Sequence, residues 1–175
     1  LAQMADSITN LNSKLLIFTG SQQIANRAMA ELVVIADQTR ASLQDTSTSF
    51  IRIVTATQRM NLALDANLAL TRVLQNSFRL SGSNATEAAG ATIQFAQALS
   101  FGALRGQELR SVLSQNAVLS TALTKAISGT GKSIFQFAEE GRFTSKFLLE
   151  VLGKNMVDIN SKAEGMAQTF ENTTT

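Results

Sequence analysis

The sequence QFAQALSFGALRGQELRSVL, residues 94–113, predicts two helices joined by a tight corner. Residues 94–100 have the composition of a helix end, and a new apolar repeat starts at Leu109. Gly102 and Gly106 bracket the link between the two helices. Because glycine adopts the left-handed backbone that ends helices at little steric cost, the two residues are placed to turn the chain. This helix–corner–helix pattern is typical of an all-α protein.

The composition supports the same fold class. The chain has 175 residues, which is enough for one domain with a sizeable core. It contains no Pro, and its ten Gly residues are spaced along a sequence rich in helix formers. We therefore expect an all-α, compact multi-helix bundle of short and medium helices with glycine-capped turns. Because charged residues make up only 16% of the chain, much of the surface must be uncharged, which favours contact with a partner.

The two ends of the chain have the spacing of long amphipathic helices that repeat every seven residues. We expect a helical lead-in over residues 1–19, a compact domain over 20–144, and a long helix over 145–175 that leads out of it, all within a fragment of a longer protein. The heptad spacing favours association with other copies of the chain, and packing within the chain is the alternative. The positions that carry it are Leu1, Met4, Ile8, Leu11, Leu15 and Phe18 at the start, and Leu148, Leu152, Met156, Ile159, Ala163, Met166 and Phe170 at the end.

Between these ends, apolar residues recur at helical spacing in six further segments. The expected buried positions are Ile24, Ala28, Leu32 and Ile35; Leu43, Ser47, Phe50, Val54 and Thr57; Leu64, Leu68, Leu70, Leu74 and Phe78; Ala88, Ala91, Phe95, Ala98 and Leu99; Leu109, Val112 and Leu113; and Leu119, Ala122, Leu123 and Ala126. Asn84 with Glu87, and Ser133 with Gln136, have the spacing of capping boxes, which mark helix starts. A further helix ends at Gly141, and the last begins at its cap, Thr144.

The corner and its neighbouring glycines resemble the tape-measure domain of minor tail proteins from tailed phages and prophages. The similarity extends from about Leu15 to Leu152 and includes the stretches FTGS at Phe18 and LSGSNATEAA at Leu80. The chain differs where the family commonly has a Glu after the corner and a Pro at the next helix start, since it has Ser114 and Asn116 there. The residues that match the family motif, all expected to be structural, are Gly82, Asn84, Glu87, Gln94, Gln97, Leu99, Gly102, Leu104, Arg105, Gly106, Glu108 and Gly141.

The resemblance implies a non-enzymatic virion protein in the lumen of the phage tail tube. Such a protein is assembled in the bacterial host cytoplasm, helps to set tail length, templates tube assembly and leaves the tube at DNA ejection. The partners that it implies are other copies of the chain and the tail tube and assembly chaperone proteins, with no small-molecule substrate. The alternative function is a membrane-interacting segment that acts during ejection, although no apolar run has the roughly 20 residues needed to span a bilayer.

Chemically reactive sites are not expected, and no catalytic, metal or cofactor-binding residues are assigned. The chain has no His and no Cys, the residues that most often bind metals or carry nucleophilic chemistry. The run AISGTGKS, residues 126–133, is similar to the end of a phosphate-binding loop but starts with Ala and follows a predicted helix, whereas such a loop must follow a buried strand. Glu139 and Glu140 are adjacent and so point about 100° apart on a helix, which does not suit a carboxylate pair. We expect an ion pair between Arg105 and Glu108 instead.

One segment carries an excess of positive charge. Between Thr46 and Thr86 the chain has four arginines, Arg52, Arg59, Arg72 and Arg79, and one acidic residue, Asp65. The first two and the last two arginines are each seven residues apart, so each pair lies on one helical face, which is expected to be a solvated surface. The alternatives are contact with an acidic tube wall or with passing DNA. Because no Tyr or Trp is present to stack on bases, DNA contact is not expected.

Overall fold

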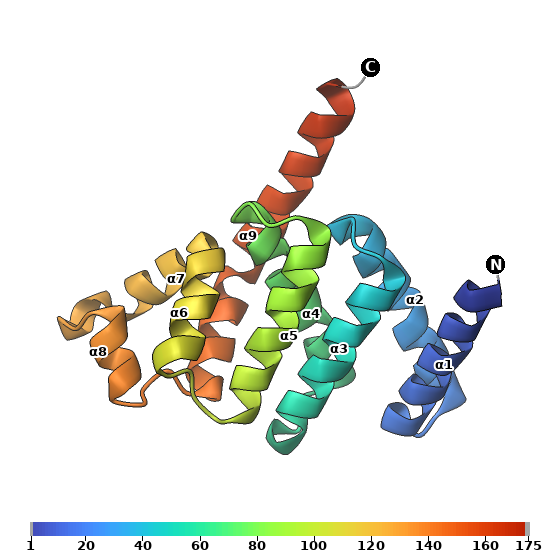
Figure 1. Cartoon of the computed structure of the whole chain (residues 1–175), viewed down its shortest axis with the longest axis horizontal. Helices are drawn as coiled ribbons and strands as arrows, with labels where there is room; N and C mark the ends of the chain where they lie inside the picture. Colours follow the sequence, from blue (N-terminus) through green and yellow to red (C-terminus); the bar gives the residue numbers. More distant parts are fainter. Residues whose placement is uncertain (1, 174–175) are drawn as a thin grey trace.

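The computed structural model describes residues 2–173, and every regular element in that range is a helix (Figure 1). The predicted all-α bundle is therefore confirmed. The nearest approach to a strand within this range is one isolated bridge between Ala103 and Thr144. The elements are α1 (Ala2–Thr19), α2 (Gln22–Thr39), α3 (Leu43–Thr57), the 3-10 turn η1 (Gln58–Met60), α4 (Leu64–Leu80), α5 (Ala85–Ser100), α6 (Gly106–Gln115), α7 (Ala117–Ile127), η2 (Ser128–Thr130), α8 (Ile134–Glu139) and α9 (Ser145–Thr173).

Helix α4 lies at the centre of the bundle. It packs against α2, α3, α5, α7 and α9, so it is covered from several directions (Figure 1). Its predicted stripe is buried except for Leu64, which is partly buried, and Leu74 and Phe78 have no exposed surface. Val73, which lies outside that stripe, is equally buried, because neighbours cover more than one face of the helix. The larger apolar core of the molecule forms around this helix.

The central helix also buries an unusual number of polar side chains, and hydrogen bonds tie several of them to neighbouring helices. Thr57 Oγ1 of α3 donates to Asn67 Oδ1 at 2.7 Å. Thr39 Oγ1 of α2 lies 3.1 Å from Gln75 Oε1, and Asn76 Nδ2 donates to Asn160 Oδ1 of α9 at 2.9 Å. Because a buried polar group is costly without a partner, these bonds specify how α2, α3 and α9 sit on α4. The polar residues buried on α4 are Asn67, Thr71, Gln75, Asn76 and Ser77.

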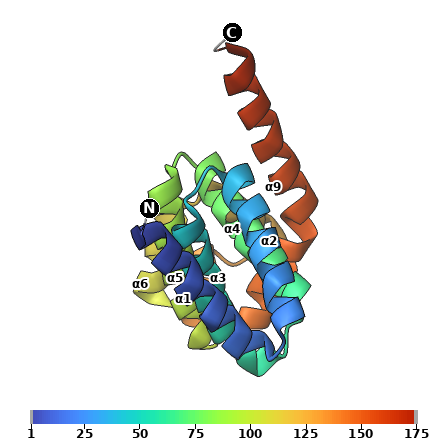
Figure 2. The same cartoon turned by 90° about the vertical axis from the view of Figure 1, so that its right-hand side faces the viewer.

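Helices α1 and α2 form a hairpin at one end of the molecule (Figures 1 and 2). Leu11 and Leu15 of α1 are buried in a second, smaller core that includes residues of α2, α3 and α4. One predicted position in α2 is wrong, since Ile24 is 42% exposed and Ala25 is buried in its place. Ala25 shares the smaller core with Leu11 and Leu15 of α1, so the buried face of α2 includes Ala25 and not Ile24.

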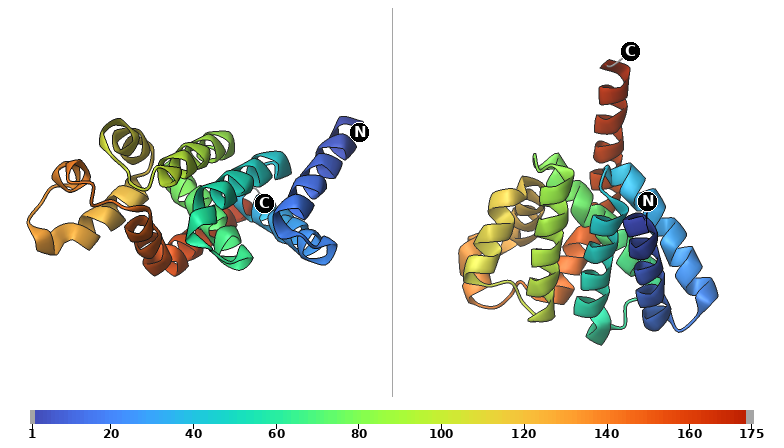
Figure 3. Two further views of the ribbon diagram at one scale, coloured as in Figure 1. Left: turned by 90° about the horizontal axis from the view of Figure 1, so that it is seen from below. Right: turned by 45° about the vertical axis from the view of Figure 1, so that its right-hand side comes forward.

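Helix α9 packs its heptad stripe inside the molecule from Leu148 to Ala163 and then leaves the bundle as a rod (Figures 1 and 2). Leu148, Leu152 and Ile159 belong to the larger core, and Ala163 is also buried. The predicted alternative of packing within the chain therefore applies to these positions. The view from below shows the α1–α2 hairpin and the α6–α8 segment at opposite ends of the molecule (Figure 3). Leu1 and the side chains of Met4 and Phe170 lie outside the part of the chain that the structure describes.

The predicted helix starts and stops follow from local capping chemistry. The capping box of Ser133 with Gln136 is present, and Thr144 Oγ1 accepts a hydrogen bond from Phe147 N at 3.2 Å. The helix ending before Gly141 is α8, and Gly141 has a left-handed backbone with φ of +68°. One expected core position in α7 is wrong, because Ala126 is exposed while the adjacent Ile127 is buried. At the end of α7 the buried position is therefore one residue later than the predicted stripe places it.

Candidate functional site

The glycine corner between α5 and α6 is built as the sequence predicts and is held by a distant segment of the chain. Gly102 and Gly106 both have left-handed backbones, with φ of +85° and +46°. Between them Leu104 is fully buried, and its N–H donates to Phe143 O at 2.9 Å. Ser145 N donates in turn to Gly102 O at 3.0 Å. The corner and the segment that leads into α9 therefore form a short two-stranded clasp.

A buried hydroxyl closes this clasp against the end of α5. Ser145 Oγ donates to Leu99 O at 2.8 Å, and the residue is only 7% exposed. Leu99 O lies in the last turn of α5, where carbonyl groups lack a partner within the helix. Leu99 O also accepts from Gly102 N at 3.1 Å, so the Ser145 hydroxyl is a second donor to this carbonyl and fixes the start of α9 beside the end of α5. Sequence reasoning missed Ser145, because the residue was seen only as the neighbour of the helix cap.

Gly141 brings a second part of the predicted motif to the corner. A β-carbon built at Gly141 would lie 2.8 Å from Nη2 and 3.4 Å from Cζ of Arg105. The guanidinium of Arg105 thus packs directly on the backbone of Gly141, and a side chain at that position would displace it. Arg105 and Gly141 are 36 residues apart in sequence, so this contact could not be inferred from local spacing.

An aromatic cluster supports the clasp from inside. Phe143 is fully buried, with its ring centroid 4.7 Å from Phe137 and 5.8 Å from Phe147. These distances and the tilted ring planes are favourable for aromatic pairs. The guanidinium of Arg142 lies over the Phe137 ring, 4.5 Å from its centroid. The cluster anchors the loop before α9, so the corner rests on a rigid base.

The outer surface of the corner carries an exposed aromatic ring next to charged groups. Phe101 is 80% exposed, more than expected for a large apolar side chain without a partner. It borders a shallow cavity of about 390 Å³, lined by Ala98, Phe101, Ala103, Arg105 and Glu108. The predicted ion pair between Arg105 and Glu108 is wrong. Among the ion pairs of residues 2–173 none joins these two side chains, and the Arg105 guanidinium packs on Gly141 instead.

The twelve motif residues do not form a single site. Gly82, Asn84 and Glu87 lie at the start of α5, where the predicted capping box is present with both hydrogen bonds at 2.9 Å. The corner residues lie at the other end, one helix of 16 residues away. Gln94 and Gln97 are exposed between them, and Ser111 Oγ of α6 lies 3.4 Å from Gln94 Oε1. The motif therefore defines the two ends of α5 and its contact with α6.

A polar junction that the sequence did not reveal lies at the start of α7. Asn116 is fully buried and caps α7, because its Oδ1 accepts from Leu119 N at 2.9 Å. Its Nδ2 donates to Ser77 Oγ of α4 at 2.7 Å, and its Oδ1 also lies 3.2 Å from Ser81 Oγ. Asn116 is one of the two positions, with Ser114, where the sequence is expected to depart from the family pattern. The only available signal was an Asn before an apolar run, which marks a cap but not its contact with α4.

The glycine run at residues 126–133 is the junction between α7 and α8 and not the end of a strand. Lys132 forms an ion pair with Glu140, and Ser133 is engaged in the capping box of α8. Glu139 ends α8, and Glu140 is its C-terminal cap. These contacts account for the residues in this run through helix ends and a surface ion pair.

The four arginines of the basic segment have different environments. Arg72 pairs with Glu164 of α9 at 2.7 Å, and Arg79 Nη1 donates to Gln38 O at 3.2 Å. Burial lowers the pKa of Arg79, and the neighbouring positive charge of Arg40 adds to this effect. Arg52 and Arg59 are exposed. Two of the four thus join helices together, so the segment presents no continuous row of four exposed positive charges.

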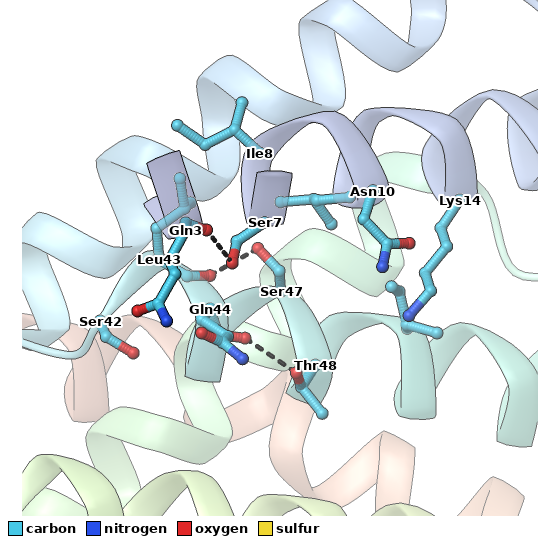
Figure 4. Close-up of a pocket in the computed structure, with 12 residues that line it drawn as sticks. Gln3, Ser7, Ile8, Asn10, Lys14, Ser42, Leu43, Gln44, Ser47 and Thr48 are labelled. Carbon is cyan, nitrogen blue, oxygen red and sulfur yellow. Dashed lines mark hydrogen bonds between the residues drawn. The ribbon is translucent and has the colours of Figure 1, made fainter. Parts of the chain in front are cut away.

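A groove of about 500 Å³ separates α1 from α3 (Figure 4). Its walls carry polar side chains such as Ser7 and Thr48, together with the apolar side chains of Ile8, Leu43 and Ile51. Figure 4 shows Ile8 on α1 above the groove and Gln44 and Thr48 on α3 below it. Within residues 2–173 no cluster of three or more His, Cys, Asp or Glu residues could hold a metal ion. In the same range no helix has both the length and the apolar character needed to cross a membrane.

Comparison with known protein families gives a match. A family model described as tape measure protein matches residues 1–175, which is the whole chain. The matched region therefore includes the clasp at the corner, the capping box at Asn84 and helix α9. No curated protein and no solved structure matches the chain.

Proposed function

Because the chain belongs to the tape measure protein family, a family of structural phage tail proteins, we propose that it helps to set tail length. In this proposal the protein lies in the lumen of the growing tube, assembles there with other copies and with tail tube and chaperone proteins, and leaves ahead of the DNA. The observation that carries the proposal is the family match over the entire chain. The all-helical architecture supports it, because a helix is a rigid element of defined length per residue.

Within this function the bundle acts as a fixed structural element and α9 as the rod that joins it to the ruler. A single helix of 175 residues would measure about 260 Å at 1.5 Å per residue. Folding into a bundle shortens this length, whereas α9, with 29 residues, alone measures about 44 Å. Length control by helix rise therefore falls on α9 and its continuation, and not on the bundle.

The exposed corner is the surface proposed for contact with tail assembly proteins. Phe101 and Arg105 are of the residue types that dominate protein–protein interfaces, and they lie beside a shallow cavity. The clasp to Ser145 and the aromatic cluster hold this surface in one geometry, which reduces the entropy lost on binding.

Insertions of equal length at two places test the division of roles. A helical insertion of 36 residues after Gly165, ten full turns, should lengthen the tail by about 54 Å in electron micrographs. The matched control is a flexible insertion of 36 residues after Ser83, in the turn between α4 and α5, which should leave tail length unchanged. Unchanged tails with the α9 insertion would refute the ruler role. Equal lengthening by both insertions would refute the fixed role of the bundle.

A further inference from the structure

The apolar repeat of α1 continues in the same register through the turn at Gly20 into α2. We call the two sets of positions involved the seam; each set recurs every seven residues, the spacing of a two-stranded coiled coil. One set is Met4, Leu11, Phe18, Ala25, Leu32 and Thr39, and the other is Leu1, Ile8, Leu15, Gln22, Met29 and Ala36.

The same register extends far beyond this hairpin. From Leu1 to Val157 no charged residue occupies either set of positions when both are continued every seven residues. The first exception is Asp158, followed by Lys162. A folded bundle does not require this continuity, because a turn can contain any number of residues without harm to the helices on either side. The uncharged repeat would therefore form one continuous stripe only if the chain were a single uninterrupted helix.

Helix α1 is the part of the bundle that is most easily released. Its substantial packing is against α2 alone, and the groove separates it from α3 (Figure 4). The hairpin covers its seam incompletely, since Ile8 and Phe18 are each 42% exposed while Leu11 and Leu15 are buried. The turn contains only Gly20 and Ser21, and Gly20 has a φ of +66° with open space around it.

We propose that α1 and α2 can open at Gly20 into one continuous helix that separates from α3 and α4 and pairs in parallel with the same helix of a second copy. The opened helix spans about 38 residues, or more than five heptads, which exceeds the three to four heptads of a sustained coiled coil. Pairing covers Ile8 and Phe18, which the hairpin leaves half exposed. In a parallel pair the two Gln22 side chains face each other, an arrangement that fixes register. This proposal deepens the proposed function by naming the surface through which copies pair.

The substitution Gly20→Ala in the full chain tests the opening. Alanine disfavours the left-handed turn and favours the continuous helix, and together these effects shift the equilibrium by on the order of 30-fold per chain. The dimer association constant should therefore rise by about the square of this factor, roughly a thousandfold. Sedimentation equilibrium over a concentration series measures it. Gly82→Ala is the control, because Gly82 also has a left-handed backbone, with φ of +101°, but joins two helices of the main core.

Two matched pairs of substitutions in the Gly20→Ala background identify the surface. Ile8 and Ile24 are the same residue type with the same 42% exposure, but only Ile8 lies on the seam. Phe18 is on the seam and 42% exposed, whereas its neighbour Ile17 is off the seam and 80% exposed. We expect Ile8→Ser and Phe18→Ser to abolish the gain in association, and Ile24→Ser and Ile17→Ser to retain it.

Two results would overturn the proposal. The first is a Gly20→Ala chain that associates no more strongly than the wild type or Gly82→Ala. The second is a loss of association that follows exposure, so that Ile17→Ser weakens the dimer as much as Phe18→Ser does. Helix content from circular dichroism identifies any variant that fails to fold, and the two seam substitutions serve as independent tests. Because the readout is association in solution, failure here leaves the tail-length experiment unaffected.

Discussion

Replacement of Asn116 by alanine should destabilise the bundle far more than its single position in a short turn suggests. The change removes the cap of α7, worth about 1 kcal/mol, and two further contacts of the buried amide, with Ser77 and Ser81, worth about 1 kcal/mol each. The expected loss is therefore about 3 kcal/mol. For a chain of this size, that corresponds to a fall in Tm of about 6–12 °C.

The assay is thermal unfolding followed by circular dichroism, with Asn84→Ala as the matched control. Asn84 is also an asparagine cap, but it is exposed and its contacts are confined to its own capping box. Its loss should cost about 1 kcal/mol, or about 2–4 °C. If the two substitutions lower Tm equally, the contact of Asn116 with α4 contributes nothing, and the reasoning from buried hydrogen bonds is refuted.

Three further outcomes are expected from the same structure. Gly141→Ala should cost about 1–2 kcal/mol, and slightly more than Gly131→Ala, which has the same φ of +68° but open space; the excess should vanish with Arg105→Ala in denaturant unfolding. ATP titration by calorimetry should give no saturable heat, and measurable affinity lost in Lys132→Ala would contradict the assignment of the glycine run to helix ends. In liposome flotation the chain should stay with the soluble fraction, and co-flotation would favour the membrane-interacting alternative.

Much of the fold could be predicted because its signals are local. Helix ends depend on residues within one turn of each other, as in the pair of Asn84 with Glu87 or the stop at Gly141. Apolar spacing likewise located the helices correctly. The rotation of each helix was less certain, since it depends on neighbours that the local pattern does not contain. Ile24 and Ala126 were assigned to the core for this reason, and the adjacent Ala25 and Ile127 are buried instead.

The candidate site was predictable in its residues but not in its contacts. Both sides of the corner were recognised, yet their clasp depends on pairs far apart in the chain, such as Ser145 with Leu99, separated by 46 residues. The junction at Asn116 is similar, because its partner Ser77 lies 39 residues away. A polar side chain in a turn gives the same local signal whether water or another helix satisfies it. Only the packing of the bundle distinguishes the two cases.

The passage of α9 from the core to Thr173 without a break has a torsional consequence. Each residue advances the helix by about 100° about its axis, so the angular setting of the bundle fixes that of every later residue of α9. Inserting one residue after Gly165 would rotate the bundle by about a quarter of a turn relative to the end of α9, while changing the length of the helix by only about 1.5 Å. The rotation of the bundle and the length of the helix can therefore be changed separately. Binding of a partner that contacts the bundle from a fixed direction would depend on the rotation and not on the length.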